Sequence, residues 1–220
     1  MTNIVHSVWN LLDKMPCIKR NLKRGLINVR ALARYLIHEH QVESNLDAVI
    51  SAIRRYDLTK YDEIVLNSER MIHKTVNLST RNGLVEIALK KDIDVQRIIP
   101  DLYNIINYEY GEVLRILQAN EAIRILVDKK NLEKINTLFP KGKIIDAEKN
   151  LAEINMHIHP AMEKTPGIIS LISNELAMND INIIETMTCS PEILWFVKEN
   201  DLLKAYEILH KLCSKQSFSK

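Results

Sequence analysis

The order of predicted elements between residues 84 and 212 repeats after about 70 residues, and this repeat constrains the fold more than any other feature of the sequence. In each round a strand is followed by a helix, two strands and a second helix, because apolar side chains recur with the spacing of strands or of helices. This order, completed by a last strand, is the βαββαβ order of the ferredoxin-like fold, in which two helices cover one face of an antiparallel sheet. The first round comprises strand 84–89, helix 95–106, strands 111–119 and 122–127, helix 132–138 and strand 143–148. The second round comprises strand 152–159, helix 166–178, strands 182–188 and 193–197, and helix 202–212.

The second round lacks a final strand of its own, since only residues 214–220 follow its last helix. Upstream of the repeats, residues 63–66 and 71–78 have the alternating pattern of strands. The sequence Arg81-Asn82-Gly83 predicts a turn before strand 84–89. We therefore expect a β-rich segment over residues 61–80 that links the first part of the chain to the repeats.

Residues 3–56 predict four helices instead of strands, because their apolar residues recur at every third and fourth position. The first covers residues 3–13, the second runs from Pro16 to Gly25, and the third follows Asn28 as its N-cap. Ser44 is the expected N-cap of the fourth helix, with Asp47 three residues later in the position of a capping box.

The third and fourth helices are joined by the short turn 40–43, which fits a helix-turn-helix module. A small helical bundle with a basic, solvated face fits the same pattern. The distribution of charge indicates that residues 1–60 have a function different from that of the rest of the chain. Residues 1–60 carry a net charge of +5, and the remaining residues carry −3. Exposed basic residues of such a region are candidates for contacts with DNA phosphates. They are Lys19, Arg20, Lys23, Arg24, Arg30, Arg34, Arg54 and Arg55.

Composition argues against several classes of protein. The five glycines lie at least 25 residues apart and cannot form a Gly-rich phosphate-binding loop, which disfavours kinases and dinucleotide enzymes. The three cysteines are far apart, so neither a disulfide framework nor a zinc site is indicated. His157 and His159 share one strand face, but the sequence supplies no third ligand, and we interpret them as packing residues. We expect no cofactor, no bound metal and no catalytic activity.

The chain has no apolar run of about 18 residues and no signal-peptide pattern at its start. A cytoplasmic protein that does not enter the membrane is therefore the expectation.

The second repeat resembles the tandem ACT region at the C-terminus of aspartokinases. The resemblance rests on Thr165-Pro166-Gly167 at the start of a helix, on the segment 176–183 that leaves this helix for a strand, and on the strand 192–197. It extends over residues 71–212, and no part of the chain resembles the kinase domain. In the first repeat Lys91-Asp92-Ile93-Asp94 stands where the second has Pro-Gly, which puts a ligand site in that repeat in doubt.

The resemblance implies that the two repeats are interleaved, with a strand upstream of the first repeat completing the sheet of the second. The segment 71–78 is the expected strand. The predicted fold class is therefore α+β, with an N-terminal helical, helix-turn-helix-like domain followed by two interleaved ferredoxin-like repeats. The expected divisions are a helical module at 1–60, linking strands at 61–80, repeats at 81–150 and 151–213, and a tail at 214–220.

The resemblance also implies that the repeats bind an amino acid or a similar small effector. The backbone amides at the start of a helix favour a carboxylate, and Gly167 permits a close approach of the backbone. The side chains of Thr165 and Asn182, with carbonyls near Met162 and Ile183, are candidates for the ammonium group. Lys164 could add charge for an acidic ligand. A turn that only joins a strand to a helix is the alternative. The expected ligand-binding residues are Met162, Lys164, Thr165, Pro166, Gly167, Ile168, Asn182 and Ile183.

Two functions remain open at the level of sequence. The first is a non-catalytic, dimeric regulator in which effector binding to the ACT repeats changes the position of a DNA-binding helical module. The second is a regulatory subunit that docks on a separate metabolic enzyme, such as an aspartokinase, through the helical module.

Overall fold

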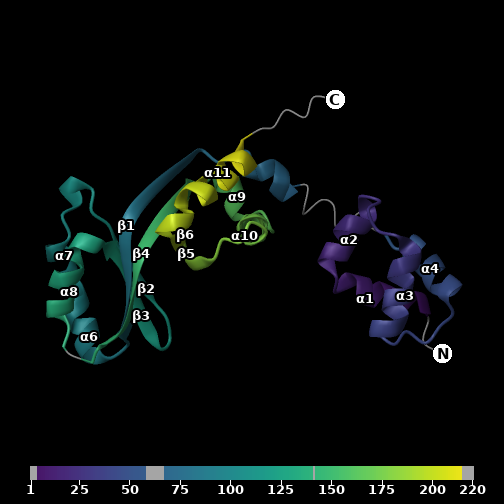
Figure 1. The fold of residues 1–220 in the computed structure, drawn as a ribbon, viewed down its shortest axis with the longest axis horizontal. Coiled ribbons are helices and arrows are strands. Elements are labelled where there is room, and N and C mark those ends of the chain that lie inside the picture. Colours follow the sequence, from purple (N-terminus) through teal and green to yellow (C-terminus); the bar gives the residue numbers. More distant parts are fainter. Residues whose placement is uncertain (1–3, 58–66, 141, 215–220) are drawn as a thin grey trace. The chain divides into compact units, whose positions relative to one another are not determined.

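The computed structural model describes residues 4–57, 67–140 and 142–214, which form helices and a single sheet of six strands (Figure 1). The chain divides into two compact units. The first comprises Met1–Arg70 with Thr165–Gly167, and the second comprises Met71–Lys164 with Ile168–Lys220.

The helical part of the first unit contains α1 (Ile4–Asp13), α2 (Pro16–Lys23), α3 (Val29–Glu39) and α4 (Leu46–Arg54). The backbone amides of Arg30 and Ala31 donate to the Asn28 side chain, which confirms the N-cap predicted for the third helix. The N-cap of α4 is Asn45, which accepts from the Ala48 amide at 2.8 Å, so the prediction of Ser44 as the cap is wrong by one residue. Asn is as good an N-cap as Ser, and sequence alone does not rank the two.

One apolar core holds these four helices together. Val8 and Leu12 of α1, Leu36 of α3 and Val49 of α4 are fully buried in it. The Trp9 indole donates to the Ala52 carbonyl at 3.0 Å and thereby ties α1 to α4.

The second unit is built on an antiparallel sheet with the strand order β2-β3-β1-β4-β6-β5. Two of its strands, β1 (Asn77–Lys90) and β4 (Ile144–His157), are each 14 residues long and run through the centre of the sheet. The others are β2 (Leu114–Gln118), β3 (Ala122–Asp128), β5 (Ile183–Cys189) and β6 (Glu192–Lys198).

Each long strand contributes to two halves of the sheet. In the first half, residues 84–90 of β1 pair with β3, and residues 85–89 pair with residues 144–149 of β4. In the second half, residues 77–81 of β1 pair with residues 153–157 of β4, and residues 151–157 of β4 in turn pair with β6. The strand that the second repeat lacks at its C-terminal end is thus supplied from upstream of the first repeat, and the two ferredoxin-like units are interleaved.

The boundary between the halves is a double irregularity in the pairing of β1 with β4. The register shifts between the pairs Arg81–Glu153 and Leu84–Leu151, and shifts again at Val85–Lys149. Gly83 and Asn150 have φ values of +71° and +57° at this boundary, as is common for the extra residue of a β-bulge. The bulges bend β1 and β4, so that each long strand pairs in both halves of the one sheet.

Helices cover the two halves separately. The core of the first half lies under α6 (Ile93–Ile98), α7 (Leu102–Ile105) and α8 (Leu132–Leu138). The core of the second half lies under α9 (Pro160–Glu163), α10 (Ile168–Ala177) and α11 (Leu202–Cys213). Figure 1 shows the two sets of helices on different sides of the sheet. The helix-free faces meet in a smaller cluster that contains Leu84, Leu126, Leu151, Leu194 and Phe196.

Several predicted boundaries are corrected by these elements. Residues 67–72 form a short helix, so the predicted strand 71–78 is helical at its first two residues, and β1 begins at Asn77. The predicted turn 81–83 lies inside β1, and the predicted strands 143–148 and 152–159 are one strand, because the bulges keep the chain extended. The predicted helix 95–106 is divided into α6 and α7 by a 3₁₀ turn that contains Pro100. The predicted strand 63–66 lies outside the described residues.

Within the described part of the chain, no helix combines the length and the apolar character needed to span a bilayer.

Candidate functional site

The turn before α10 was the expected centre of the ligand site. Gly167 in this turn has φ +93°, a conformation that L-amino acids with a side chain rarely adopt. A methyl group on Gly167 would lie 3.5 Å from the Ser68 hydroxyl oxygen, and Ser68 is buried. The short helix 67–72 therefore packs against this turn at Gly167.

Exposure differs among the residues expected around that turn. Lys164 and Pro166 are exposed and Thr165 is half-buried. Met162 and Ile168 point into the core of the second half, at 1% and 4% exposure. Only the backbone of these two residues could contact a ligand, so a side-chain role for them is not compatible with the fold.

Asn182 and Ile183, the other two expected ligand residues, lie at the start of β5 and line a cavity of about 420 Å³. None of Thr165, Pro166 and Gly167 lines this cavity. Its other walls come from the helix-free face of the first half: Glu86 and Ala88 of β1, Arg124 of β3, and Ile145, Asp146 and Glu148 of β4, with Ile184 beside Ile183. We call it the inter-half cavity, since both halves of the sheet line it.

The sheet register explains why carboxylates gather in the inter-half cavity. Glu86 of β1 is directly opposite Glu148 of β4, and Ala88 is directly opposite Asp146. Opposite residues in an antiparallel pair point to the same face, so the three carboxylates share one face of the sheet. Like charges at directly opposite positions repel, and this arrangement costs stability unless cations compensate it.

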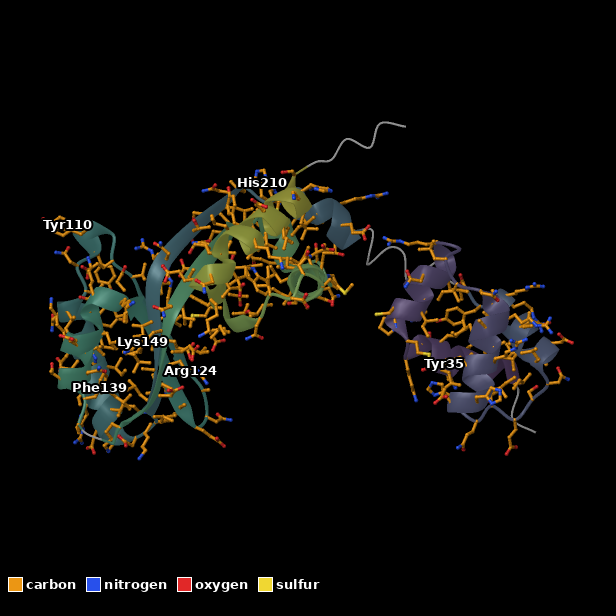
Figure 2. The ribbon with its side chains drawn as sticks, in the orientation of Figure 1. Tyr35, Tyr110, Arg124, Phe139, Lys149 and His210 are labelled. Carbon is orange, nitrogen blue, oxygen red and sulfur yellow. The ribbon has the colours of Figure 1, made fainter. Side chains whose placement is uncertain are left out.

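Two cations compensate part of this charge. Arg124 of β3 (labelled in Figure 2) forms an ion pair with Glu86 through Oε1, and Lys198 of β6 forms one with Glu148. Glu86 is only 2% exposed, and its second oxygen, Oε2, has no hydrogen-bond partner among the described residues. Burial raises the pKa of Glu86 above its ordinary value of 4.5, although the bond to Arg124 opposes this shift.

Sequence reasoning found Asn182 and Ile183 but missed the charged wall of the cavity. Glu86 and Arg124 are 38 residues apart in the sequence, and only the pairing of β1 with β3 brings them together. A signal was present, because Glu86 is the only charged residue in the apolar run Leu84–Leu89. A charged side chain in a buried strand is kept where it is paired or used.

Most of the expected DNA-contacting residues are exposed. On α3, Arg30 and Arg34 occupy the face opposite the core, and Arg54 and Arg55 end α4. Lys23 and Arg24 are exposed as well. Lys19 is an exception, since its side chain is only 12% exposed and its amine lies 3.5 Å from the carboxylate of Asp13. The side chain of Arg20 lies outside the described residues.

The described residues contain no group of three or more His, Cys, Asp or Glu side chains that could hold a metal ion. The cysteines Cys17, Cys189 and Cys213 are free thiols.

Comparison with known proteins shows what the sheet-containing unit is similar to. No protein-family model matches the sequence. A search of curated proteins likewise gives no match. Solved structures do match: the regulatory subunit of aspartate kinase from Thermus flavus superposes with a TM-score of 0.52 at 13% identity, over 64% of this chain and 99% of that chain.

Two further structures agree with this result. The ligand-free regulatory subunit of aspartate kinase from Thermus thermophilus gives a TM-score of 0.51 at 12% identity, over 64% of this chain and 99% of that chain. A structure of aspartokinase alpha and beta subunits gives 0.51 at 14% identity, over 63% and 97%. The chain thus contains the fold of a tandem ACT regulatory region, without a kinase domain. In particular, the chain shares its fold with the regulatory subunits of aspartate kinase.

Proposed function

We propose that this protein is a non-catalytic, amino-acid-sensing regulator in which the interleaved repeats bind a small effector. The observation that carries the proposal is the complete tandem ACT fold, since the two matched regulatory subunits of aspartate kinase are covered over 99% of their length. The residues proposed to contact the effector from the turn before α10 are Lys164, Thr165, Pro166 and Gly167, with backbone atoms of Met162 and Ile168. Asn182 and Ile183 are proposed to contact it from β5.

The test is a thermal-shift screen of the full chain against the twenty amino acids. An effector at 100 times its Kd adds about 2.7 kcal/mol of stability, which corresponds to an upward shift of about 5–10 °C for a chain of this size. The variant Thr165→Val should reduce the shift caused by the effector, and Thr188→Val on the exposed end of β5 is the matched control. A screen in which no amino acid shifts the transition would contradict effector binding.

We further propose that the N-terminal helices act as a helix-turn-helix module that binds DNA, with the chain acting as a homodimer in the transcriptional regulation of amino-acid metabolism. The exposed basic residues on α3 and α4 support this, because contacts with phosphate need accessible cations. The proposed contacts come from Arg30, Arg34, Arg54 and Arg55, with additional phosphate contacts from Arg20, Lys23 and Arg24. Lys19 is left out because its side chain is 12% exposed and pairs with Asp13.

Fluorescence anisotropy with labelled duplex DNA tests the DNA-binding proposal. The double variant Arg54→Ala with Arg55→Ala should weaken DNA binding. It should also reduce the slope of log affinity against log salt concentration by about 2, since each lost phosphate contact removes nearly one unit of slope. Lys134→Ala combined with Lys211→Ala, on exposed sites of α8 and α11, removes the same charge and should leave both quantities unchanged. An unchanged salt slope in the arginine variant would contradict the assignment.

The alternative function is a subunit that docks on a separate metabolic enzyme, such as an aspartokinase, through the helical unit. A copurifying enzyme whose association survives nuclease treatment would favour this alternative over DNA binding.

A further inference from the structure

The beginning of β1 leaves one edge of the sheet open. Among the described residues, 77–81 of β1 pair with β4 alone, because the pairing with β3 begins at Leu84. The Val76 amide extends the pairing with β4 by donating to the His157 carbonyl at 2.7 Å. Residues 76–80, which we call the open edge, have the sequence Val-Asn-Leu-Ser-Thr and contain neither a charged residue nor proline. Proteins normally protect a free strand edge with such residues, because its unpaired backbone groups pair readily with another extended chain.

The other free edges of the sheet carry charges. Within the described part of the chain they are β2, β5 and residues 144–149 of β4, which pair on one side only. Arg115 lies in β2, Glu185 lies in β5, and residues 144–149 include three charged residues. The open edge is therefore the one free edge of the described strands that has no charged residue. A strand left unprotected in this way is suited to β-augmentation, in which an extended peptide adds to the sheet.

Helix α11 forms a groove with the open edge. A cavity of about 280 Å³ lies between them, and its lining residues are Thr75, Val76, Asn77, Leu78, Tyr206, His210, Cys213 and Ser214. The rings of Tyr206 and His210 stack with their centroids 5.8 Å apart (His210 is labelled in Figure 2). Leu203, one turn before Tyr206 on the same face of α11, is 77% exposed, and Val76 is 65% exposed. Since side chains alternate along a strand, every second residue of an added peptide would contact this apolar and aromatic wall.

The charge beside the groove is positive. The segment 71–83 contains Lys74 and Arg81 but no acidic residue. Arg81 is paired with Asp128 at 3.5 Å, whereas Lys74 is exposed. The neighbouring His73 has its Nδ1 atom 3.2 Å from the last carbonyl of α11, so Lys74 lies where the groove meets the end of this helix. The charged residues of α11 are Lys204, Glu207 and Lys211, which add one further positive charge.

This charge disfavours the occupants that the chain itself could supply. A second copy paired antiparallel through the open edge would bring Lys74 of each chain close to Arg81 of the other, and like charges at facing positions destabilise a strand pair. Residues 215–220 contain two lysines and no acidic residue. We propose that the groove binds an extended segment of a partner protein by β-augmentation, with alternate apolar side chains against α11 and an acidic residue beside Lys74. This surface is separate from the proposed effector and DNA contacts.

Fluorescence anisotropy of the full chain with labelled seven-residue peptides tests the proposal. The probe Glu-Val-Thr-Leu-Thr-Val-Glu has apolar residues at alternate positions and a carboxylate at each end, so that one carboxylate lies near Lys74 in either direction of the strand. The peptide Lys-Val-Thr-Leu-Thr-Val-Lys reverses the charge, and Glu-Val-Thr-Pro-Thr-Val-Glu interrupts the backbone pairing. The probe should bind, and each of the other two peptides should bind at least tenfold more weakly.

Variants of the chain locate the bound peptide. Val76→Glu places a negative charge on the open edge and should weaken binding of the probe at least tenfold, and Lys74→Glu should do the same. Ile93→Glu changes a similarly exposed apolar residue on α6 of the first half, and as the matched control it should bind the probe as the wild type does. Circular dichroism establishes that each variant is folded before it is titrated.

A wild-type chain that does not bind the probe would overturn the proposal, and so would a folded Val76→Glu protein that binds it undiminished. A chain shortened after Ser214 that binds the probe when the full chain does not would assign the groove to residues 215–220 instead. A wild-type dimer that Val76→Glu dissociates, together with no binding of the probe, would assign the groove to a second copy.

Discussion

Removal of Arg115 should destabilise the sheet far more than a partly exposed residue normally would. Arg115 of β2 makes two bonds to Glu153 of β4, with Nε to Oε2 at 3.1 Å and a terminal nitrogen to Oε1 at 3.2 Å. Glu153 is 3% exposed, so the variant Arg115→Ala leaves a buried carboxylate without its cation. Breaking such a pair costs about 3–5 kcal/mol, and the 29% exposure of the Arg115 side chain places the expected loss near the lower end, at about 3 kcal/mol.

A double variant tests whether the cost comes from the uncompensated charge. Replacing both partners with apolar residues of similar size, as in Arg115→Met with Glu153→Leu, should cost less than about 1 kcal/mol, since an apolar pair leaves no buried charge. Urea denaturation followed by Trp195 fluorescence reports on this unit, because Trp195 lies in the core of the second half. A Trp9→Phe background removes the signal of the helical unit. A double variant as unstable as Arg115→Ala would refute this reasoning, and so would a single variant that loses less than 1 kcal/mol.

Three further predictions concern the sheet-containing unit. Glu112 accepts bonds from the Asn107 amide and from Lys130 and Asn131, which lower its pKa to about 2. A lowered pKa stabilises the fold at pH values above the ordinary pKa of 4.5. The wild type should therefore be more stable than Glu112→Gln at pH 7. In urea titrations this difference in the free energy of unfolding should shrink to zero as the pH falls from 4.5 toward 2. The opposite sign is expected for Glu86, because burial raises its pKa above 4.5. The free energy of unfolding of the wild type relative to Glu86→Gln should decline as the pH rises above 4.5. Urea titrations in the acid range that show this difference increasing would contradict the burial of Glu86. Gly83→Ala should lower the free energy of unfolding by about 1–2 kcal/mol, because a residue with a side chain is strained at φ +71°. The new methyl group has no neighbour within 4 Å among the described residues, so the cost should come from the backbone and not from a clash. An unchanged stability in the denaturation assay would mean that the bulge adapts.

The sequence predicted the repeat, the four N-terminal helices and the interleaved sheet, because each depends on local apolar spacing or on the resemblance. It did not predict that β1 and β4 are continuous. Asn82-Gly83 and Asn150 have the composition of turns, but pairing on both sides keeps the strands extended and converts the turns to bulges. The helix at 67–72 was missed for a related reason: a short alternating segment fits a strand or a helix, and packing decides between them.

The candidate site was predicted only where one segment carries the signal. Asn182 stood out because it lies where a helix gives way to a strand. Glu86, Arg124 and Asp146 come from three strands, and their proximity follows from a register that local patterns do not encode. Long-range pairing is therefore what separates the predicted site residues from those that only the structure brings together.

The two proposed activities make a regulator only if they are coupled, and our central claim is therefore that effector binding to the repeats changes the affinity of the helical unit for DNA. The most direct test is the DNA affinity of the full chain, measured by anisotropy at fixed salt with and without a saturating amount of the amino acid that gives the largest thermal shift. Coupling of 1–3 kcal/mol predicts that the Kd for DNA changes by about 5- to 150-fold. A Kd for DNA that is the same with and without the bound effector would contradict the claim.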